Sequence, residues 1–184
     1  MEGTKADPSP DPAFLERTPV FGALERPAFD LIAGHLQRRL LPGGSLVVAE
    51  GAGAREMYVV ESGGVEVRVH GDPGDDGDLV VATLGPGDCF GEMSLLDVQP
   101  RSASVRTLEE TSLLVLRYRD LLEIRRRDPE AFLLLVLNLA REVSRRLRAS
   151  ERRLLDLLRR LPDAAVATRE TSGIPDVGLG RSSP

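Results

Sequence analysis

A carboxylate and a guanidinium stand nine positions apart near the middle of the sequence. Glu92 follows Gly91, and an ionised carboxylate is an acceptor that suits the hydroxyl groups of a sugar. Arg101 offers a planar fork of donors that suits a phosphate, and Ser94 and Ser102 add hydroxyl donors. The unpaired N–H groups at the start of a short helical turn would add further donors. Together these residue types predict a site for a sugar phosphate with a single negative charge.

The region that must position these residues has the apolar pattern of β-strands. Over 45–117, short apolar or alternating runs are separated by glycine- and proline-rich turns, which is typical of a barrel or sandwich. The expected loop at 71–77 contains no apolar residue. The runs that we expect to be strands are Ser45–Glu50, Glu56–Glu61, Val65–Val69, Leu79–Leu84, Ser102–Leu108 and Leu113–Leu116.

Helical spacing flanks this region on both sides. Apolar residues over 13–36 predict two short helices, and 118–127 predicts a third. Asp128 and Pro129 then form an N-cap followed by proline at the first helical position. A long helix is therefore expected from about 129 to 160.

Composition excludes several other classes of protein. The 184 residues are 41% hydrophobic, so the chain has enough apolar side chains for a core, and its single cysteine excludes a disulfide framework within the monomer. Two histidines are too few for a histidine-rich metal site. Residues 1–100 carry 7 basic and 17 acidic side chains, whereas 101–160 carry 15 arginines and 9 acids. This arginine excess falls mostly on the long helix, where a solvated face explains it better than a nucleic acid does.

The central motif resembles the phosphate-binding cassette of cyclic nucleotide-binding domains. Members of this family include catabolite activators, kinase regulatory subunits and nucleotide-gated channels. The match consists of 91–96 followed by 100–103, and the glycine and strand pattern extends the resemblance over roughly 14–160. It implies an α+β fold: an eight-stranded antiparallel β jelly-roll barrel with N-terminal helices, a short cassette helix and a long C-terminal helix.

The resemblance also implies roles for individual residues. Glu92 would accept a hydrogen bond from the ribose 2′-hydroxyl, and Arg101 would bind the cyclic phosphate. Ser102, directly after the arginine, favours cyclic AMP while leaving cyclic GMP possible. An idle barrel in which Arg101 pairs with Glu92 is the alternative. The ligand-binding set that we expect is Gly91, Glu92, Met93, Ser94, Arg101, Ser102, Ala103 and Ser150.

The long helix carries an apolar seven-residue repeat. Eight of its nine seam positions are apolar, which is the spacing of a coiled coil and predicts a homodimer. Packing of a lone helix on its own barrel is the alternative. Ser150 is the polar member, and by the resemblance it would contact the nucleotide base. The seam positions are Leu133, Ala140, Leu147, Leu154 and Leu161 in one column and Val136, Val143, Ser150 and Leu157 in the other.

These patterns predict four segments. Residues 1–12 are a disordered tail, 13–127 the nucleotide-binding barrel, 128–161 the lid and dimerisation helix, and 162–184 a second disordered tail. We expect a stand-alone domain without a helix-turn-helix, hence no direct DNA binding. The most apolar run is nine residues long, too short for a bilayer of about 30 Å, so we expect a cytoplasmic chain without membrane contact.

Three functional classes remain to be compared. The first is a cyclic nucleotide sensor that signals through its C-terminal helix to a twin or a protein partner. The second is an interaction and dimerisation module with a degenerate, unliganded pocket. The third, a metal-dependent barrel enzyme, would need clustered ligands, and His35 and His70 lie in different predicted elements. We therefore expect a non-enzyme with neither catalytic nor metal-binding residues.

Overall fold

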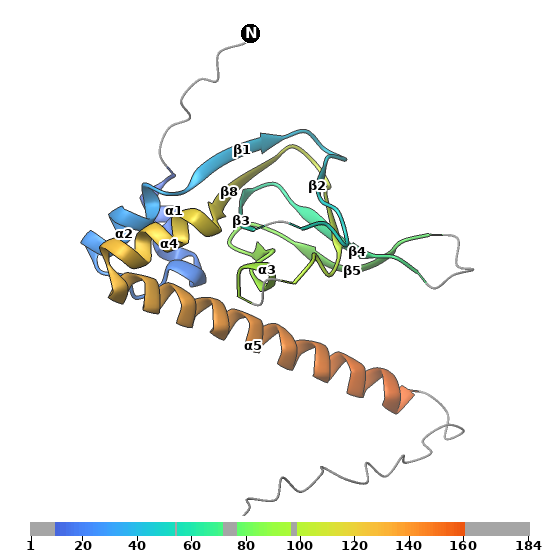
Figure 1. Cartoon of the computed structure of the whole chain (residues 1–184). Coiled ribbons are helices and arrows are strands. Elements are labelled where there is room, and N and C mark those ends of the chain that lie inside the picture. The colour runs from blue at the N-terminus through green and yellow to red at the C-terminus, as the bar shows by residue number, and fades with distance from the viewer. Residues whose placement is uncertain (1–9, 54, 72–76, 97–98, 161–184) are drawn as a thin grey trace, which may run out of the picture. The chain divides into compact units, whose positions relative to one another are not determined.

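The computed structural model describes residues 10–53, 55–71, 77–96 and 99–160 (Figure 1). Its contacts divide the chain into two units, Met1–Arg146 and Leu147–Pro184. All of the strands belong to the first unit, and the described part of the second is the end of the long helix. The expected tails at 1–12 and 162–184 lie outside the described residues, except for residues 10–12.

Eight strands form two four-stranded antiparallel sheets, in the orders β1-β8-β3-β6 and β2-β7-β4-β5. Figure 1 shows the sheets facing each other, with α1, α2 and α4 gathered at one end. The predicted α+β jelly-roll fold is therefore confirmed. The strands are β1 (Gln37–Leu41), β2 (Leu46–Val48), β3 (Glu56–Ser62), β4 (Val65–Val69), β5 (Leu79–Leu84), β6 (Cys89–Phe90), β7 (Ser104–Thr107) and β8 (Thr111–Arg117).

Two strands at the centre of their sheet, β3 and β8, are buried on both faces. Tyr58 and Val60 of β3 point into a core shared by both sheets, while Met57 and Val59 point into a second core with the helices. Side chains alternate between the faces of a strand, so a strand covered on both sides is apolar at nearly every position. This explains why β3 reads as a continuous apolar run.

Helices precede and follow the sheets as expected. The long helix α5 begins at an N-cap, where Asp128 Oδ1 accepts a hydrogen bond of 2.9 Å from Ala131 N, and Pro129 follows. Asn138 ties this helix to the N-terminal segment, because its side-chain amide donates to Val20 O at 3.2 Å and Gly22 O at 2.8 Å. The helices are α1 (Pro12–Arg17), the 3₁₀ turn η1 (Pro19–Phe21), α2 (Arg26–Ala33), α3 (Met93–Leu96), α4 (Tyr118–Arg127) and α5 (Pro129–Arg160).

The strand pattern did not reveal β1 or β6. The β1 strand contains two adjacent arginines, and one of them, Arg38, forms an ion pair of 2.6 Å with Glu61 of β3. That pairing joins positions far apart in the sequence, so no local alternation signals it. The β6 strand has two residues, too few for any period. The expected loop at 71–77 falls mostly on residues outside the described ranges.

Candidate functional site

The turn between β6 and α3 carries the glycine–glutamate pair predicted to bind the ligand. Gly91 has φ +76°, a left-handed conformation that favours glycine. A Cβ atom at this position would collide with Arg101 Nη1 and lie 3.0 Å from Glu56 O. The backbone thus approaches the arginine closely only because residue 91 has no side chain.

Arg101 is buried, with 4% of its surface exposed, and lies against this turn. Its Nη1 donates to Gly91 O at 3.0 Å, and its Nη2 donates to Glu56 O at 2.7 Å. Its Nε is buried and finds no acceptor among the residues that the structure describes. An unsatisfied buried donor costs about 1–3 kcal/mol, and more on a charged group. Within the described part of the chain, the guanidinium is therefore held by two carbonyl oxygens and pairs with no carboxylate.

Glu92 is equally buried, at 4% exposure, and lies beside the arginine's carbonyl partner. Burial raises the pKa of its carboxyl group, and the nearby charges of Arg146 and Arg101 act in the opposite direction. Its Oε1 forms an ion pair of 3.3 Å with Arg146 Nη1. The structure thus brings Glu92 and Arg101 together, but the acid's ion pair is with a third residue.

Arg146 of α5 is a site residue that the sequence analysis did not identify. Besides Glu92, its guanidinium donates to Cys89 O and lies 3.3 Å from Glu142 Oε1. Arg146 is 54 positions from Glu92 and 57 positions from Cys89, so no local pattern in the sequence indicates these contacts. Arg146 is also the last residue of the first unit of the chain.

Two aromatic rings lie beneath the arginine in the core shared by both sheets. Tyr58 and Phe90 stack with centroids 4.9 Å apart and planes inclined by 12°. Arg101 Cζ lies 5.9 Å from the centroid of the Tyr58 ring. The Tyr58 hydroxyl donates to Glu56 Oε2 at 2.7 Å, and its pKa is raised by burial and then by that acidic partner. The rings therefore supply a rigid floor and a cation–π contact for the guanidinium.

The other residues predicted to bind the ligand differ in exposure. Ser94 is buried, whereas Met93 and Ser102 are exposed and Ala103 is half-buried. Ser150 is exposed on the part of α5 that belongs to the second unit.

Neighbouring Cys89 is a buried free thiol. Burial and the charge of Glu92 raise its pKa to about 12, so it remains a neutral core residue at ordinary pH. Among the described residues, no group of three histidine, cysteine or acidic side chains is placed to hold a metal ion. No helix in the described ranges combines the length and apolarity needed to cross a membrane.

Two jelly-roll sheets thus hold a buried glutamate in the turn between β6 and α3 and a buried arginine against that turn. The family model described as "Cyclic nucleotide-binding domain" matches residues 38–128. The chain therefore belongs to the cyclic nucleotide-binding domain family, which confirms the resemblance found in its cassette.

Individual relatives agree with this assignment. The chain is 40% identical over 144 residues to the Cyclic AMP receptor protein of Thermus thermophilus, covering 78% of this chain and 63% of that protein. It is 36% identical over 105 residues to the cAMP-dependent protein kinase regulatory subunit of Yarrowia lipolytica, covering 57% and 27%. The crystal structure of Thermus thermophilus catabolite activator protein superposes with a TM-score of 0.65 at 40% identity, over 77% and 63% of the two chains. The chain thus spans less than two thirds of these relatives' length.

Proposed function

We propose that this chain is a cyclic nucleotide sensor in which Arg101 binds the cyclic phosphate. The observation that carries the proposal is the buried guanidinium whose Nε has no acceptor among the described residues. A phosphate oxygen would supply that acceptor and neutralise the charge. Glu92 would accept a hydrogen bond from the ribose 2′-hydroxyl, since a carboxylate has several acceptor positions and Arg146 engages one oxygen. The proposed cassette also includes Gly91, Met93, Ser94, Ser102 and Ala103.

Cyclic AMP is the ligand that we place ahead of cyclic GMP. Two observations support this order: the serine directly after Arg101, and 40% identity to a protein named for cyclic AMP. Replacing Ser102 with threonine would shift the preference towards cyclic GMP. A comparison of the two dissociation constants in the wild type and in Ser102→Thr tests this order.

The output is proposed to run through α5 as a regulatory signal, without catalysis. Arg146 of this helix forms an ion pair with Glu92, so a ligand that binds Glu92 would directly affect a contact of the helix. We propose that the helix segment 128–161 pairs with a second copy to form a homodimer, with 13–127 as the binding barrel. Ser150 is the proposed contact to the base. Binding must favour one arrangement of the helix over another if it is to shift a population.

Titration calorimetry with cyclic AMP and cyclic GMP tests the proposal. In Arg101→Leu we expect a loss of about 2–5 kcal/mol of binding free energy, because a buried charged partner is removed. The matched control is Arg106→Leu, an exposed arginine five positions later, which should bind like the wild type. Arg101→Lys keeps the positive charge but lacks the planar pair of guanidinium donors. If this variant is folded and binds the nucleotide weakly, the weak binding reflects the lost donors and not unfolding. Wild-type affinity in Arg101→Leu would remove the role assigned to this residue.

A second candidate function is an interaction module whose pocket stays idle. The exposed leucines of α5 at 147–160 favour it, because an apolar surface of this kind attracts a partner whether or not a nucleotide binds. This function predicts self-association without a change of melting temperature on adding either cyclic nucleotide. A melting scan with both ligands distinguishes the two functions.

A further inference from the structure

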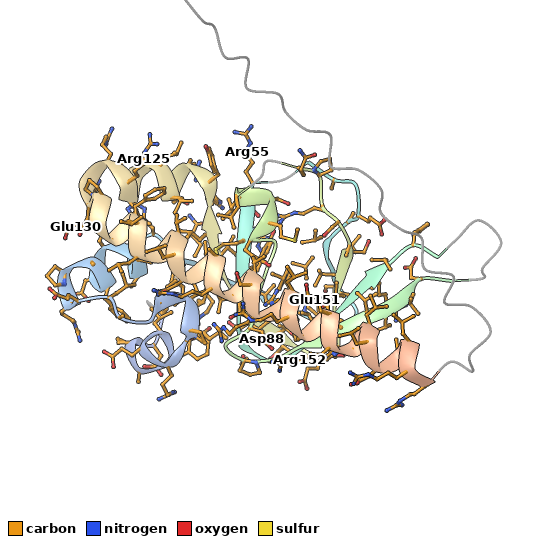
Figure 2. The ribbon with its side chains drawn as sticks, turned by 90° about the horizontal axis from the view of Figure 1, so that it is seen from below. Arg55, Asp88, Arg125, Glu130, Glu151 and Arg152 are labelled. Atoms are coloured by element: carbon orange, nitrogen blue, oxygen red, sulfur yellow. The ribbon has the colours of Figure 1, made fainter. Side chains whose placement is uncertain are left out.

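A second cluster of arginines lies at the surface where β3, β8 and α4 meet. It lines an open hollow of about 670 Å³, within the range of roughly 300–1,000 Å³ that is typical of small-molecule sites. Figure 2 shows Arg55 at the edge of the molecule, with its side chain directed away from the ribbon. The lining residues are Arg55, Glu56, Arg117, Tyr118 and Arg119.

The lining carries three arginines and one glutamate, hence a net charge of +2. The carboxylate of Glu56 is already engaged, because Arg117 Nε lies 3.4 Å away and the Tyr58 hydroxyl donates to it at 2.7 Å. Arg39 adds a further positive charge 3.7 Å from the same carboxylate. The single acid of the hollow is thus shared among several donors and cannot neutralise the remaining arginines.

Among the residues that the structure describes, two of the arginines keep donors free for a ligand. Arg55 Cζ lies 5.2 Å from the centroid of the Tyr118 ring, a contact that orients the cation while leaving its N–H groups available. Arg119 is 72% exposed, and its Nε is 3.7 Å from Asp120 Oδ1, a loose contact at the surface. Both arginines line the hollow, and their contacts with the described residues leave N–H donors unpaired.

The start of helix α4 adds to the positive potential. Its N-cap residue is Arg117, whose side chain has only donor groups and therefore cannot accept a hydrogen bond from the helix N–H groups. Among the described residues, no side chain caps this end of the helix. The N-terminal end of a helix carries a partial positive charge, and the first turn of α4 contains one acid, Asp120, against the two arginines at 117 and 119. Cations at 117 and 119, with Arg55 beside them, thus form an arrangement that a ligand anion would stabilise.

We propose that this hollow is a second ligand site, which binds a phosphate-bearing anion with two or more negative charges. The net charge of the lining sets the charge of the ligand, and the planar forks of Arg55 and Arg119 match phosphate oxygens in pairs. The site is separate from the cassette, although Glu56 contributes to both: its carbonyl oxygen accepts from Arg101, and its carboxylate lies in the hollow.

Titration calorimetry of the full chain with inorganic pyrophosphate at low ionic strength tests the proposal. We expect saturable binding of one pyrophosphate, weakened at least roughly tenfold in the double variant Arg55→Gln/Arg119→Gln, because each arginine donates charge-assisted hydrogen bonds. Both side chains are exposed, so the variant should fold, which a melting scan checks. Arg125→Gln is the matched control: it removes one exposed charge near the other end of α4 and should leave binding unchanged.

Arg101→Leu provides the second control, because pyrophosphate in the cassette would need that arginine. Retained binding in Arg101→Leu supports a separate site, whatever this variant does to cyclic nucleotide affinity. The proposal is overturned if the wild type does not bind pyrophosphate, or if the double variant binds it as tightly as the wild type. Equal weakening by Arg125→Gln, or loss of binding in Arg101→Leu, overturns it as well.

Discussion

The two halves of helix α5 differ in burial. In the first half, up to Arg146, Leu135 and Leu139 are completely buried and Asn138 nearly so. In the second half, every residue from 147 to 160 is exposed, and its five leucines are 46–61% exposed. Leu161, the last predicted seam residue, lies outside the described ranges. The buried residues of the first half are not members of the predicted seam, whose positions at 133, 136, 140 and 143 are exposed or half-buried. The apolar side chains that pack on the core thus lie on a different stripe of the helix from the seven-residue repeat.

The polar contacts of the helix follow the same division. In the first half, Asn138 binds two backbone carbonyls of the N-terminal segment, and Arg146 binds Glu92 and Cys89. The polar contact described for the second half is a surface ion pair of 3.6 Å between Arg159 and Asp156. The first half thus packs on the folded core, whereas the second half has an exposed apolar surface.

Leu135→Ala, in the first half, should give the largest loss of stability. We expect a loss of about 2–5 kcal/mol in the free energy of unfolding, because a fully buried leucine leaves a cavity. Urea unfolding followed by circular dichroism measures it. A loss below about 1 kcal/mol, in the range of ordinary surface substitutions, would show that the first half is not packed as described.

Arg146→Gln tests where the packed half meets the cassette. Removing the ion-pair partner of a buried carboxylate should weaken cyclic nucleotide binding by about tenfold, or about 1.4 kcal/mol. Arg145→Gln is the matched control, since its more exposed guanidinium pairs with Glu142, at 2.5 Å, and has no contact with Glu92 among the described residues. Titration calorimetry should therefore distinguish two adjacent arginines. Equal affinities in the two variants would contradict the role of Arg146.

The raised pKa of Glu92 predicts a pH dependence at the same junction. A carboxyl group whose pKa is higher in the folded state binds more protons there, so its contribution to stability falls as pH rises from the unfolded pKa through the folded one. Glu92→Gln should remove this decline and raise the melting temperature of the ligand-free protein at neutral pH. Melting scans across pH measure it, and an unchanged pH profile in Glu92→Gln would contradict the prediction.

Leu154→Ala should give the smallest effect on unfolding. Because this leucine is exposed, its substitution should change the free energy of unfolding by no more than about 0.5 kcal/mol, measured at a dilution that suppresses association. Association itself should weaken if the second half is the dimer seam. Sedimentation at increasing protein concentration measures this weakening. Loss of stability comparable to that of Leu135→Ala would show that the second half is buried in the monomer.

Local pattern was sufficient for much of the fold. Alternation predicted Val65–Val69, and the Asp128–Pro129 signal placed the start of α5 correctly. Strands β1 and β6 were missed, because one is stabilised by an ion pair across strands and the other is two residues long. In the site, the motif predicted Glu92 and Arg101 to be neighbours, and the structure brings them together. It did not predict that Arg146, rather than Arg101, pairs with Glu92.

The sequence alone determined which residue types stand at the cassette and where apolar side chains repeat, since both are properties of neighbouring positions. Burial of Glu92 and Arg101, the carbonyl oxygens that hold the arginine, and the convergence of Arg55 and Arg117 were decided only by tertiary structure. These contacts join residues far apart in the chain. The free energy of a charge depends on which groups and how much water surround it, and folding alone sets those surroundings.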